Sequence, residues 1–88
     1  MKIKWTSEFK KDVKRSKQKG KLAREIKSLM ELMVTKEPLP PEYNDHELKW
    51  NWTGHRECHL EGDWLVIYRI SGDTILFVRT GTHEELFK

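Results

Sequence analysis

Side chains that can transfer protons or hold a phosphate collect in the second half of the chain. They are His46, His55, His59, Asp63, Arg79 and His83. An imidazole gives or takes a proton near neutral pH, and a guanidinium grips a phosphate group through two hydrogen bonds at once. These residue types could therefore supply an acid, a base and charge stabilisation for a reaction at a phosphate.

Three short runs rich in β-branched and aromatic residues must position these groups. The runs span Arg56–Leu60, Trp64–Ile70 and Thr74–Val78, and glycine-containing turns at 61–63 and 71–73 join them. Such runs and turns are typical of an antiparallel meander. We therefore expect a three-stranded unit with titratable groups at its strand ends.

The chain begins with a predicted strand and a predicted helix. Lys2–Trp5 alternates between polar and apolar residues, as a short strand does. Thr6 can cap the start of a helix, and an acidic residue follows in the first turn. This pattern predicts a helix over about Ser7–Lys17, with Phe9 and Val13 four residues apart on its inner face.

A second helix and a long loop are predicted to follow. Gly20 is expected to mark the break, and the helix to run over about Lys21–Thr35. Its apolar stripe is expected to be core: Leu22, Ile26, Leu29, Met30 and Met33. Prolines from Pro38 onward forbid further helix and open a loop to about Thr53. A loop of this length in a small domain is usually functional or mobile.

The predicted order, strand–helix–helix–loop–three strands, indicates an α+β fold in a single domain over residues 1–88. We expect a four-stranded, largely antiparallel sheet with the two helices packed on one face. The first strand has no neighbour in sequence, so it must pair with the meander or remain unpaired. The other face would be partly open, and a ligand could lie there.

Composition excludes several classes of protein. With 88 residues, 35% charged and 36% hydrophobic, the chain can bury one modest core and is too apolar for a disordered segment. The lone Cys58 excludes an internal disulfide and a cysteine-based zinc site. We expect no signal peptide, no membrane span and a cytoplasmic location.

The net charge of +3 hides an asymmetry between the two halves. Residues 1–36 hold twelve Lys and Arg and four Asp and Glu, a balance of +8, whereas residues 37–88 hold five and ten, a balance of −5. A basic half favours a phosphate-rich or acidic partner. A solvated, lysine-rich helix face would show the same charge, and charge alone leaves both interpretations open.

Three motifs in the second half resemble one known family. They are DH-x-L at 45–48, H-x-E-x-DW at 59–64 and RTGTH-x-x-LF at 79–87. In order and spacing they resemble the YafQ branch of the RelE/ParE superfamily, which are toxins of type II toxin–antitoxin systems. The resemblance covers essentially the whole chain, and it implies the RelE-like version of the α+β fold expected above. It also implies a ribosome-dependent mRNA endoribonuclease, or mRNA interferase, that needs no cofactor.

The partners implied by the resemblance are an antitoxin, in a hetero-oligomeric complex, and the ribosome with the mRNA in its A site. Whether toxin and antitoxin together bind operator DNA is left open by the sequence. The antitoxin is expected to be acidic or amphipathic and to wrap part of the basic surface.

Metal-free RNA cleavage needs a base for the ribose 2′-OH, an acid for the departing 5′-oxygen and a cation for the charge on the phosphorane. We assign Arg79 to the phosphate and His83 to the leaving group, expecting both on one face of one strand. His59 or Asp63 would be the base, close together across a tight turn, and the sequence does not divide that role. His46 would reach the site only if its loop folds over the sheet.

Each assignment has a plainer alternative. Arg79 could make a surface ion pair, and His83 could be an ordinary exposed histidine near the chain end. Asp63 could be a turn-capping residue, beside a half-buried His59. His55 is interpreted as structural or exposed, and Cys58 as a small strand residue; the role of Glu57 is left open.

RNA binding is predicted to use aromatic and basic side chains. Phe87 and Trp64 could stack on a splayed base, although Trp64 could equally be core, and Trp50 and Trp52 are interpreted as core or loop anchors. Basic residues on and between the two helices are expected to dock on ribosomal RNA: Lys10, Lys11, Lys14, Arg15, Lys17, Lys19 and Lys21.

Three rival functions share these features. A ParE-like toxin would have the same fold and act on DNA gyrase, and a non-enzymatic nucleic-acid-binding module would have the basic face without the chemistry. A metal nuclease could use His59, Asp63 and His83, but no compact ligand motif is present. The joint presence of His46, His59, Asp63, Arg79 and His83 argues against the ParE-like toxin, whereas the binding module is distinguished by salt-sensitive binding without cleavage.

Overall fold

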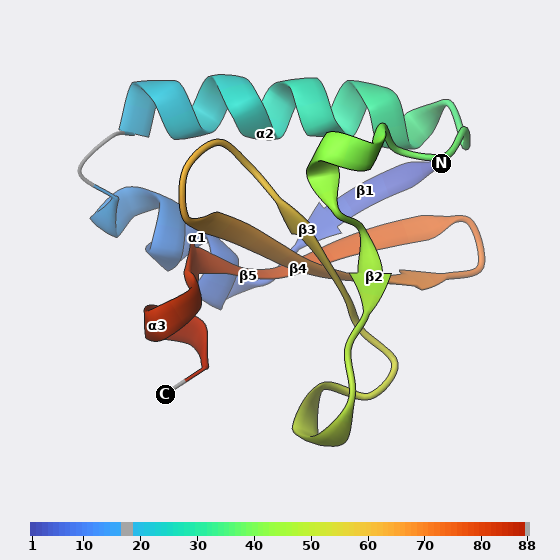
Figure 1. Ribbon diagram of the computed structural model, residues 1–88. Helices are drawn as coiled ribbons and strands as arrows, with labels where there is room; N and C mark the ends of the chain where they lie inside the picture. The colour runs from blue at the N-terminus through green and yellow to red at the C-terminus, as the bar shows by residue number, and fades with distance from the viewer. Residues whose placement is uncertain (17–18, 88) are drawn as a thin grey trace.

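Five strands form one sheet in the order β1-β5-β4-β3-β2 (Figure 1). The structure, a computed structural model, describes residues 1–16 and 19–87. The strands are β1 (Lys2–Trp5), β2 (His46–Glu47), β3 (Arg56–His59), β4 (Trp64–Ser71) and β5 (Thr74–Thr82). β1 runs parallel to β5, and every other pair is antiparallel. The α+β class and the largely antiparallel sheet are as predicted.

The helices are α1 (Ser7–Arg15), α2 (Lys19–Val34) and the short α3 (His83–Leu86), with 3₁₀ turns η1 (Pro41–Tyr43) and η2 (Trp50–Trp52). Thr6 caps α1 as predicted, because its hydroxyl accepts a hydrogen bond from the Phe9 N–H at 3.0 Å. Gly20 lies inside α2, so the predicted break at this residue is wrong. The helix tolerates Gly20 at an exposed position in its first turn.

The break lies at Ser16, which is extended and whose N–H donates to the Val13 carbonyl. The first helix therefore ends at Arg15, two residues before the predicted end. Lys17 lies outside the described residues, as does the side chain of Lys19, so the structure does not test their predicted part in the basic surface.

One face of the sheet packs against α1 and α2, as predicted. Phe9 of α1 stacks on Phe77 of β5 with ring centroids 5.4 Å apart. From α2 the buried stripe is Leu22, Ile26, Leu29 and Met33, with Met30 partly buried beside it. These residues meet Val66, Tyr68 and Ile75 of the sheet, and Figure 1 shows α2 running along that side.

The fifth strand, β2, lies inside the segment predicted to be a loop. His46 pairs with Glu57 and Glu47 with Arg56. The prediction of four strands was wrong because two exposed polar residues carry no β pattern. The loop therefore does fold onto the sheet, and it places His46 beside β3.

Asp45 holds β2 in place. Its carboxylate accepts hydrogen bonds from the Arg56 guanidinium, at 3.1 and 3.3 Å, and from the Tyr68 hydroxyl. Burial, and then the hydrogen bond to Asp45, raise the pKa of Tyr68. Side chains from β3 and β4 thus fix the residue that precedes His46.

β5 continues to Thr82, four residues beyond the predicted end at Val78. A bulge lies at Val78, because Ile67 pairs with Arg79 while the next residue, Tyr68, pairs with Phe77. Among the described residues, no helix is long and apolar enough to cross a membrane.

Candidate active site

Strand pairing brings the predicted site residues onto the face of the sheet turned away from α2. Residues directly opposite one another on neighbouring strands share a face. One cross-strand row is His46, Glu57, Ile67 and Arg79, and the next is His59, Leu65 and Gly81. Three strands, β2, β3 and β5, thus carry His46, Glu57, His59 and Arg79 to one side. At about 4.8 Å per strand, roughly 10 Å separates the backbones at Glu57 and Arg79.

Glu57 lies between two histidines. Its side chain is 6% exposed, and its two carboxylate oxygens lie 3.5 Å from His46 Nε2 and 3.4 Å from His59 Nε2. The centroids of the imidazole rings are 6.2 Å apart. Glu57 is therefore a central member of the site. The sequence signal for it was its place two residues from His59 on the same strand, which puts both on one face.

Asn44 sets the orientation of both rings. Its carbonyl oxygen lies 2.7 Å from His46 Nδ1, so Nδ1 carries a proton and donates it. Its amide nitrogen lies 3.4 Å from His59 Nε2. Asn44 adopts a left-handed backbone with a φ of 46°, a conformation that asparagine tolerates better than most residues. The two imidazoles are thus held from Asn44 and from Glu57.

Arg79 is anchored by a buried carboxylate. Asp12 of α1, whose side chain is 4% exposed, accepts from Arg79 Nε at 2.7 Å and Nη2 at 3.1 Å. Asp12 also accepts from the Thr80 N–H at 3.1 Å and from Arg15 at 2.7 Å. Within the part of the chain that is described, Nη1 of Arg79 has no hydrogen-bond partner. The guanidinium is therefore fixed and keeps one nitrogen for a further acceptor.

Opposing effects act on the pKa of Asp12. Burial raises it, but the hydrogen bonds from Arg79, from the Thr80 N–H and from Arg15 outweigh burial and leave it below its usual value. The same hydrogen bond to Asp12 raises the pKa of Arg79. Both groups are therefore charged near neutral pH. The alternative that Arg79 makes an ion pair is also true, and its partner is buried rather than on the surface.

His83 does not share a strand with Arg79, which corrects the predicted geometry. β5 ends at Thr82, and His83 is the first residue of α3. Thr82 and Glu85 form a capping box with hydrogen bonds of 2.9 and 3.2 Å, and these bonds lower the pKa of Glu85. The cap turns the chain out of the sheet, so α3 rather than β5 orients His83.

Gly81 is covered by α3 and is not open to a substrate. A Cβ built there would meet Leu86 at 3.4 Å and Glu85 at 3.5 Å. The small residue at 81 therefore makes room for α3 to fold back over β5.

A groove of about 720 Å³ joins α3 to the segment before β3. Ten residues line it: Leu48, Lys49, Trp50, Asn51, Trp52, His55, Glu57, His83, Leu86 and Phe87. The Phe87 ring lies 4.9 Å from His83 and 6.3 Å from Trp52, between centroids. Trp52 in turn meets His55 edge-on at 5.4 Å. Phe87 is thus held in the groove beside His83, and Trp52 anchors the loop as predicted.

Two predicted site residues lie apart from these groups. Asp63 is in the exposed turn before β4, and among the described residues no hydrogen bond or ion pair joins it to His59. Trp64 is half-buried against the core that α2 covers, on the other face from His59. The structure therefore favours the alternative of core packing for Trp64.

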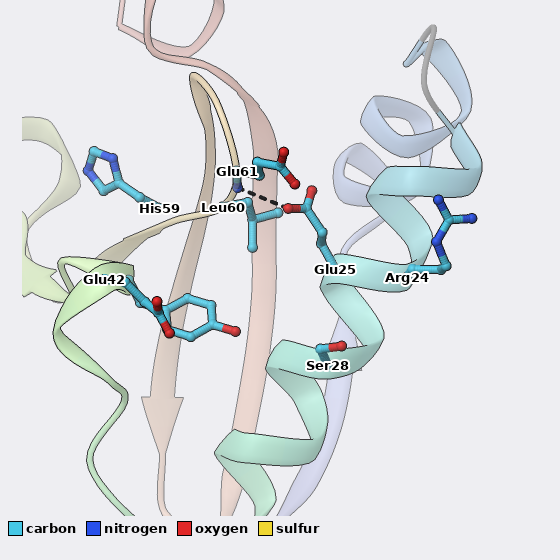
Figure 2. A pocket seen from close by; sticks show the side chains of 8 residues that line it. Arg24, Glu25, Ser28, Glu42, His59, Leu60 and Glu61 are labelled. Carbon is cyan, nitrogen blue, oxygen red and sulfur yellow. Dashed lines mark hydrogen bonds between the residues drawn. The ribbon is translucent and has the colours of Figure 1, made fainter.

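A second cavity, of about 440 Å³, lies between α2 and the end of β3. Figure 2 shows Leu60 directed toward α2 and its neighbour His59 directed away. Glu25, Glu42 and Glu61 line this cavity, and Glu25 accepts a hydrogen bond from the Glu61 N–H at 3.0 Å. With Arg24 as the cation of the lining, the three glutamates leave the cavity net acidic, which disfavours a phosphate there.

Cys58 is fully buried, and burial raises the pKa of its thiol. A thiol that stays protonated is a poor nucleophile, so Cys58 is a core residue, as interpreted from the sequence. Among residues 1–16 and 19–87, no group of three or more His, Cys, Asp and Glu side chains is placed to hold a metal ion.

The basic surface lies on the helical side. Lys10, Lys11 and Lys14 of α1 are exposed, and Arg15 is 72% exposed although it bonds Asp12. An apolar groove of about 420 Å³ runs between α1 and α2. Its lining is Trp5, Phe9, Val13, Ala23, Ile26 and Met30, with Lys10, Lys14 and Lys27 beside them.

Comparison with known proteins agrees with this architecture. The chain is 40% identical over 86 residues to the mRNA interferase toxin YafQ of Escherichia coli strain K12, covering 97% of this chain and 94% of the relative. It superposes on the crystal structure of YafQ from E. coli strain BL21(DE3) with a TM-score of 0.87 at 39% identity, covering 98% and 97% of the two chains.

Two further solved structures are similar. One is the E. coli DinJ–YafQ toxin–antitoxin complex, with a TM-score of 0.84, 39% identity and coverage of 98% and 96%. The other is a metal-bound toxin from Helicobacter pylori, with a TM-score of 0.87, 36% identity and coverage of 99% of both chains. A family model described as bacterial toxin of type II toxin–antitoxin system, YafQ, matches residues 1–88. The chain therefore belongs to the YafQ family of toxins of type II toxin–antitoxin systems.

Proposed function

We propose that this toxin is an endoribonuclease that cuts translated mRNA on the ribosome and so inhibits translation. The observation that carries the proposal is the constellation on one side of the sheet. An anchored arginine, a carboxylate between two imidazoles, and a third histidine at the mouth of a groove gather there. The curated relatives of similar length are mRNA interferases.

The reaction needs one group to remove the proton of the ribose 2′-OH and another to protonate the 5′-oxygen that leaves. His59 and His46 are the candidates for the base, because Glu57 and Asn44 orient both rings. Asp63 remains a candidate through the family resemblance, and it would have to act from the exposed turn. The products would be a 2′,3′-cyclic phosphate and a 5′-hydroxyl.

Arg79 and His83 complete the proposed mechanism. The guanidinium, fixed by Asp12, would offer its Nη1 to the phosphate oxygens as negative charge builds. His83 would protonate the leaving oxygen, and Phe87 beside it would stack on a splayed base. The groove between α3 and β3 is wide enough, at about 720 Å³, for a nucleotide to enter.

Docking on the ribosome would use the lysines of α1 and the start of α2. Their contacts would be with phosphates of ribosomal RNA, so they would position the toxin without reading sequence. The apolar groove between the two helices suits the cognate antitoxin, since an acidic amphipathic segment could place apolar side chains in it and acids beside Lys10, Lys14 and Lys27. DinJ, in complex with E. coli YafQ, is such a cognate partner in a relative.

The test is primer extension on a defined mRNA translated with purified ribosomes, with and without the toxin. Discrete cuts that require the ribosome, and that fall by about 10²–10⁴-fold with His83→Ala, would support the proposal. Intact mRNA would contradict it, and inhibition of DNA gyrase would then be measured, because a ParE-like toxin shares this fold.

A second arm addresses metal dependence, since one relative is a metal-bound toxin. The cleavage step would be repeated in EDTA, with a polyamine replacing the magnesium that the ribosome needs. Persistent cleavage is expected if the side chains alone transfer the protons. Loss of cleavage that returns only with a divalent metal would refute the metal-free mechanism.

A further inference from the structure

Trp50 occupies a backbone conformation that does not suit it. Its φ is +60°, in the left-handed region, where a bulky residue is an outlier and glycine is favoured. The turn η2 fixes this conformation, because the Trp50 carbonyl accepts from the Thr53 N–H at 3.1 Å and from its hydroxyl at 2.7 Å. A third bond, from the Trp52 N–H to the Lys49 carbonyl at 3.2 Å, closes the same turn.

The fold gains little from this side chain. Trp50 is 90% exposed, the highest value among the large hydrophobic residues exposed in the described chain. Trp52, two residues on, is half-buried and contacts the rings of both His55 and Phe87. Strain without burial marks Trp50 as a residue retained for contact with something outside the chain.

The place of Trp50 indicates what that contact is. It lines the same groove as Glu57, His83 and Phe87, and the turn that carries it projects beyond the edge of the sheet, below β2 (Figure 1). A single exposed indole beside a groove for RNA is the usual surface on which an unpaired base stacks. Lys49, exposed in the same lining, offers a charge to the neighbouring phosphate.

We propose that Trp50 is a stacking platform for an mRNA base next to the scissile bond, in the groove that Phe87 also lines. This inference rests on the proposed function. Together the two aromatic rings would hold the nucleotides on either side of the phosphate apart, and so align the 2′-OH for attack. Trp50 would then contribute to substrate choice as well as to affinity, because purines stack more strongly than pyrimidines.

The test compares Trp50→Gly with Trp52→Ala and Ile70→Ala. Ile70 is 51% exposed on β4 and lies outside the groove of Trp50, so it controls for the loss of an exposed apolar side chain. Trp50→Gly should lower cleavage on programmed ribosomes by roughly 5- to 150-fold, the range expected for one stacked base. Its melting temperature should not fall, because glycine adopts a positive φ freely. Trp52→Ala should melt earlier, and Ile70→Ala should cleave normally.

An abasic nucleotide identifies the base. Wild type and Trp50→Gly are compared on mRNAs that carry one abasic site at each position around the cut. The wild-type cleavage rate divided by the Trp50→Gly rate should fall to about one on the mRNA whose abasic site replaces the stacked base. On that mRNA the base is already missing, so removing the indole ring removes no further contact. A ratio that stays high at every position would show that Trp50 contacts ribosomal RNA, and would overturn the assignment.

The two levels of the proposal fail differently. Normal cleavage by Trp50→Gly on intact mRNA would refute the role of Trp50 and leave the endoribonuclease function standing. Absence of cleavage by the wild-type toxin would refute the proposed function, and the stacking role with it.

Discussion

Replacing Asp12 by alanine should both destabilise the protein and weaken cleavage. Asp12 accepts four hydrogen bonds, two from Arg79, one from Arg15 and one from the Thr80 N–H. The last of these caps the edge of β5 beyond the end of β1, where none of the described strands pairs on that side. One buried side chain thus closes a sheet edge and anchors the arginine proposed to bind the phosphate.

The size of the effect follows from what the removal leaves behind. Breaking a buried ion pair costs about 3–5 kcal/mol when the remaining charge is fully enclosed. Arg79 is 32% exposed and Arg15 is 72% exposed, so water can reach both. The buried Thr80 N–H is left without its acceptor, at a cost of about 1–3 kcal/mol. We expect a net loss of about 2–3 kcal/mol, which lowers the melting temperature of a domain this size by roughly 10–20 °C.

Thermal and denaturant unfolding measure this loss, with Asp73→Ala as the matched control. Asp73 is 63% exposed and lies 3.5 Å from Lys36 Nζ, and an exposed pair of this kind is worth about 0.2–1 kcal/mol. On programmed ribosomes, Asp12→Ala should also lower kcat by up to about 100-fold, because a loosened Arg79 no longer meets the phosphate in register. If Asp12→Ala unfolds at the same temperature and denaturant concentration as Asp73→Ala, the structural role assigned to Asp12 is refuted.

Acid gives an independent check, with the sign set by the pKa of Asp12. The folded pKa lies below the ordinary value of 3.8, so the unfolded chain binds the proton more readily. The stability that Asp12 contributes is complete above about pH 5 and is lost as the pH falls through 3.8 and below. The difference in stability between wild type and Asp12→Ala should therefore shrink on acidification. A difference that grows in acid would contradict the assignment of a charged Asp12.

Three further changes test the remaining parts of the site. Glu57→Gln should keep the fold but lose part of the rate enhancement of about 10²–10⁴-fold that positioned acid–base groups contribute. The control is Glu47→Gln, because the side chain of Glu47 on β2 is 82% exposed, and this variant should cleave normally. Equal cleavage rates for the two variants would exclude Glu57 from the mechanism. Tyr68→Phe removes a hydrogen bond to Asp45 and should cost about 1–2 kcal/mol in urea unfolding, with no change if β2 is held by other interactions. Reversing the charge of three exposed lysines of α1 should weaken the salt dependence of ribosome binding. In a plot of the logarithm of the binding constant against the logarithm of the salt concentration, the slope should fall in magnitude by about one for each phosphate that the variant no longer binds. An unchanged slope would show that the docking surface lies elsewhere. The three lysines are Lys10, Lys11 and Lys14.

Periodic patterns predicted the scaffold because they record burial directly. The apolar stripe of α2 is the consequence of one face meeting a core, and the apolar, β-rich run of β4 reflects a strand that is buried on both faces from Leu65 to Tyr68. Both elements lie as predicted. The N-cap at Thr6 and the turns of the meander depend on local hydrogen bonds and local backbone, so they too could be predicted from short stretches of sequence.

β2, the strand that was missed, lacks a local signal. It has two exposed residues, and its place depends on Asp45 reaching Arg56 and Tyr68, 11 and 23 residues away. The turn of the chain at Thr82 does carry a local signal, the capping-box pattern T-x-x-E at 82–85, which the prediction of a continuing strand overlooked. His83 is consequently positioned by α3, and the small residue at 81 serves the packing of that helix.

By itself the sequence determined which groups are present, the α+β class and the family, because motif spacing and hydrophobic periodicity are written along the chain. Only the tertiary structure decided how those groups combine. The pairing of β2 with β3 makes Glu57 the carboxylate between His46 and His59, and the packing of α1 on the edge of β5 joins Asp12 to Arg79, 67 residues apart. Such contacts depend on strand register and helix placement. Both are set by many weak preferences along the whole chain, so no single position in the sequence reveals them.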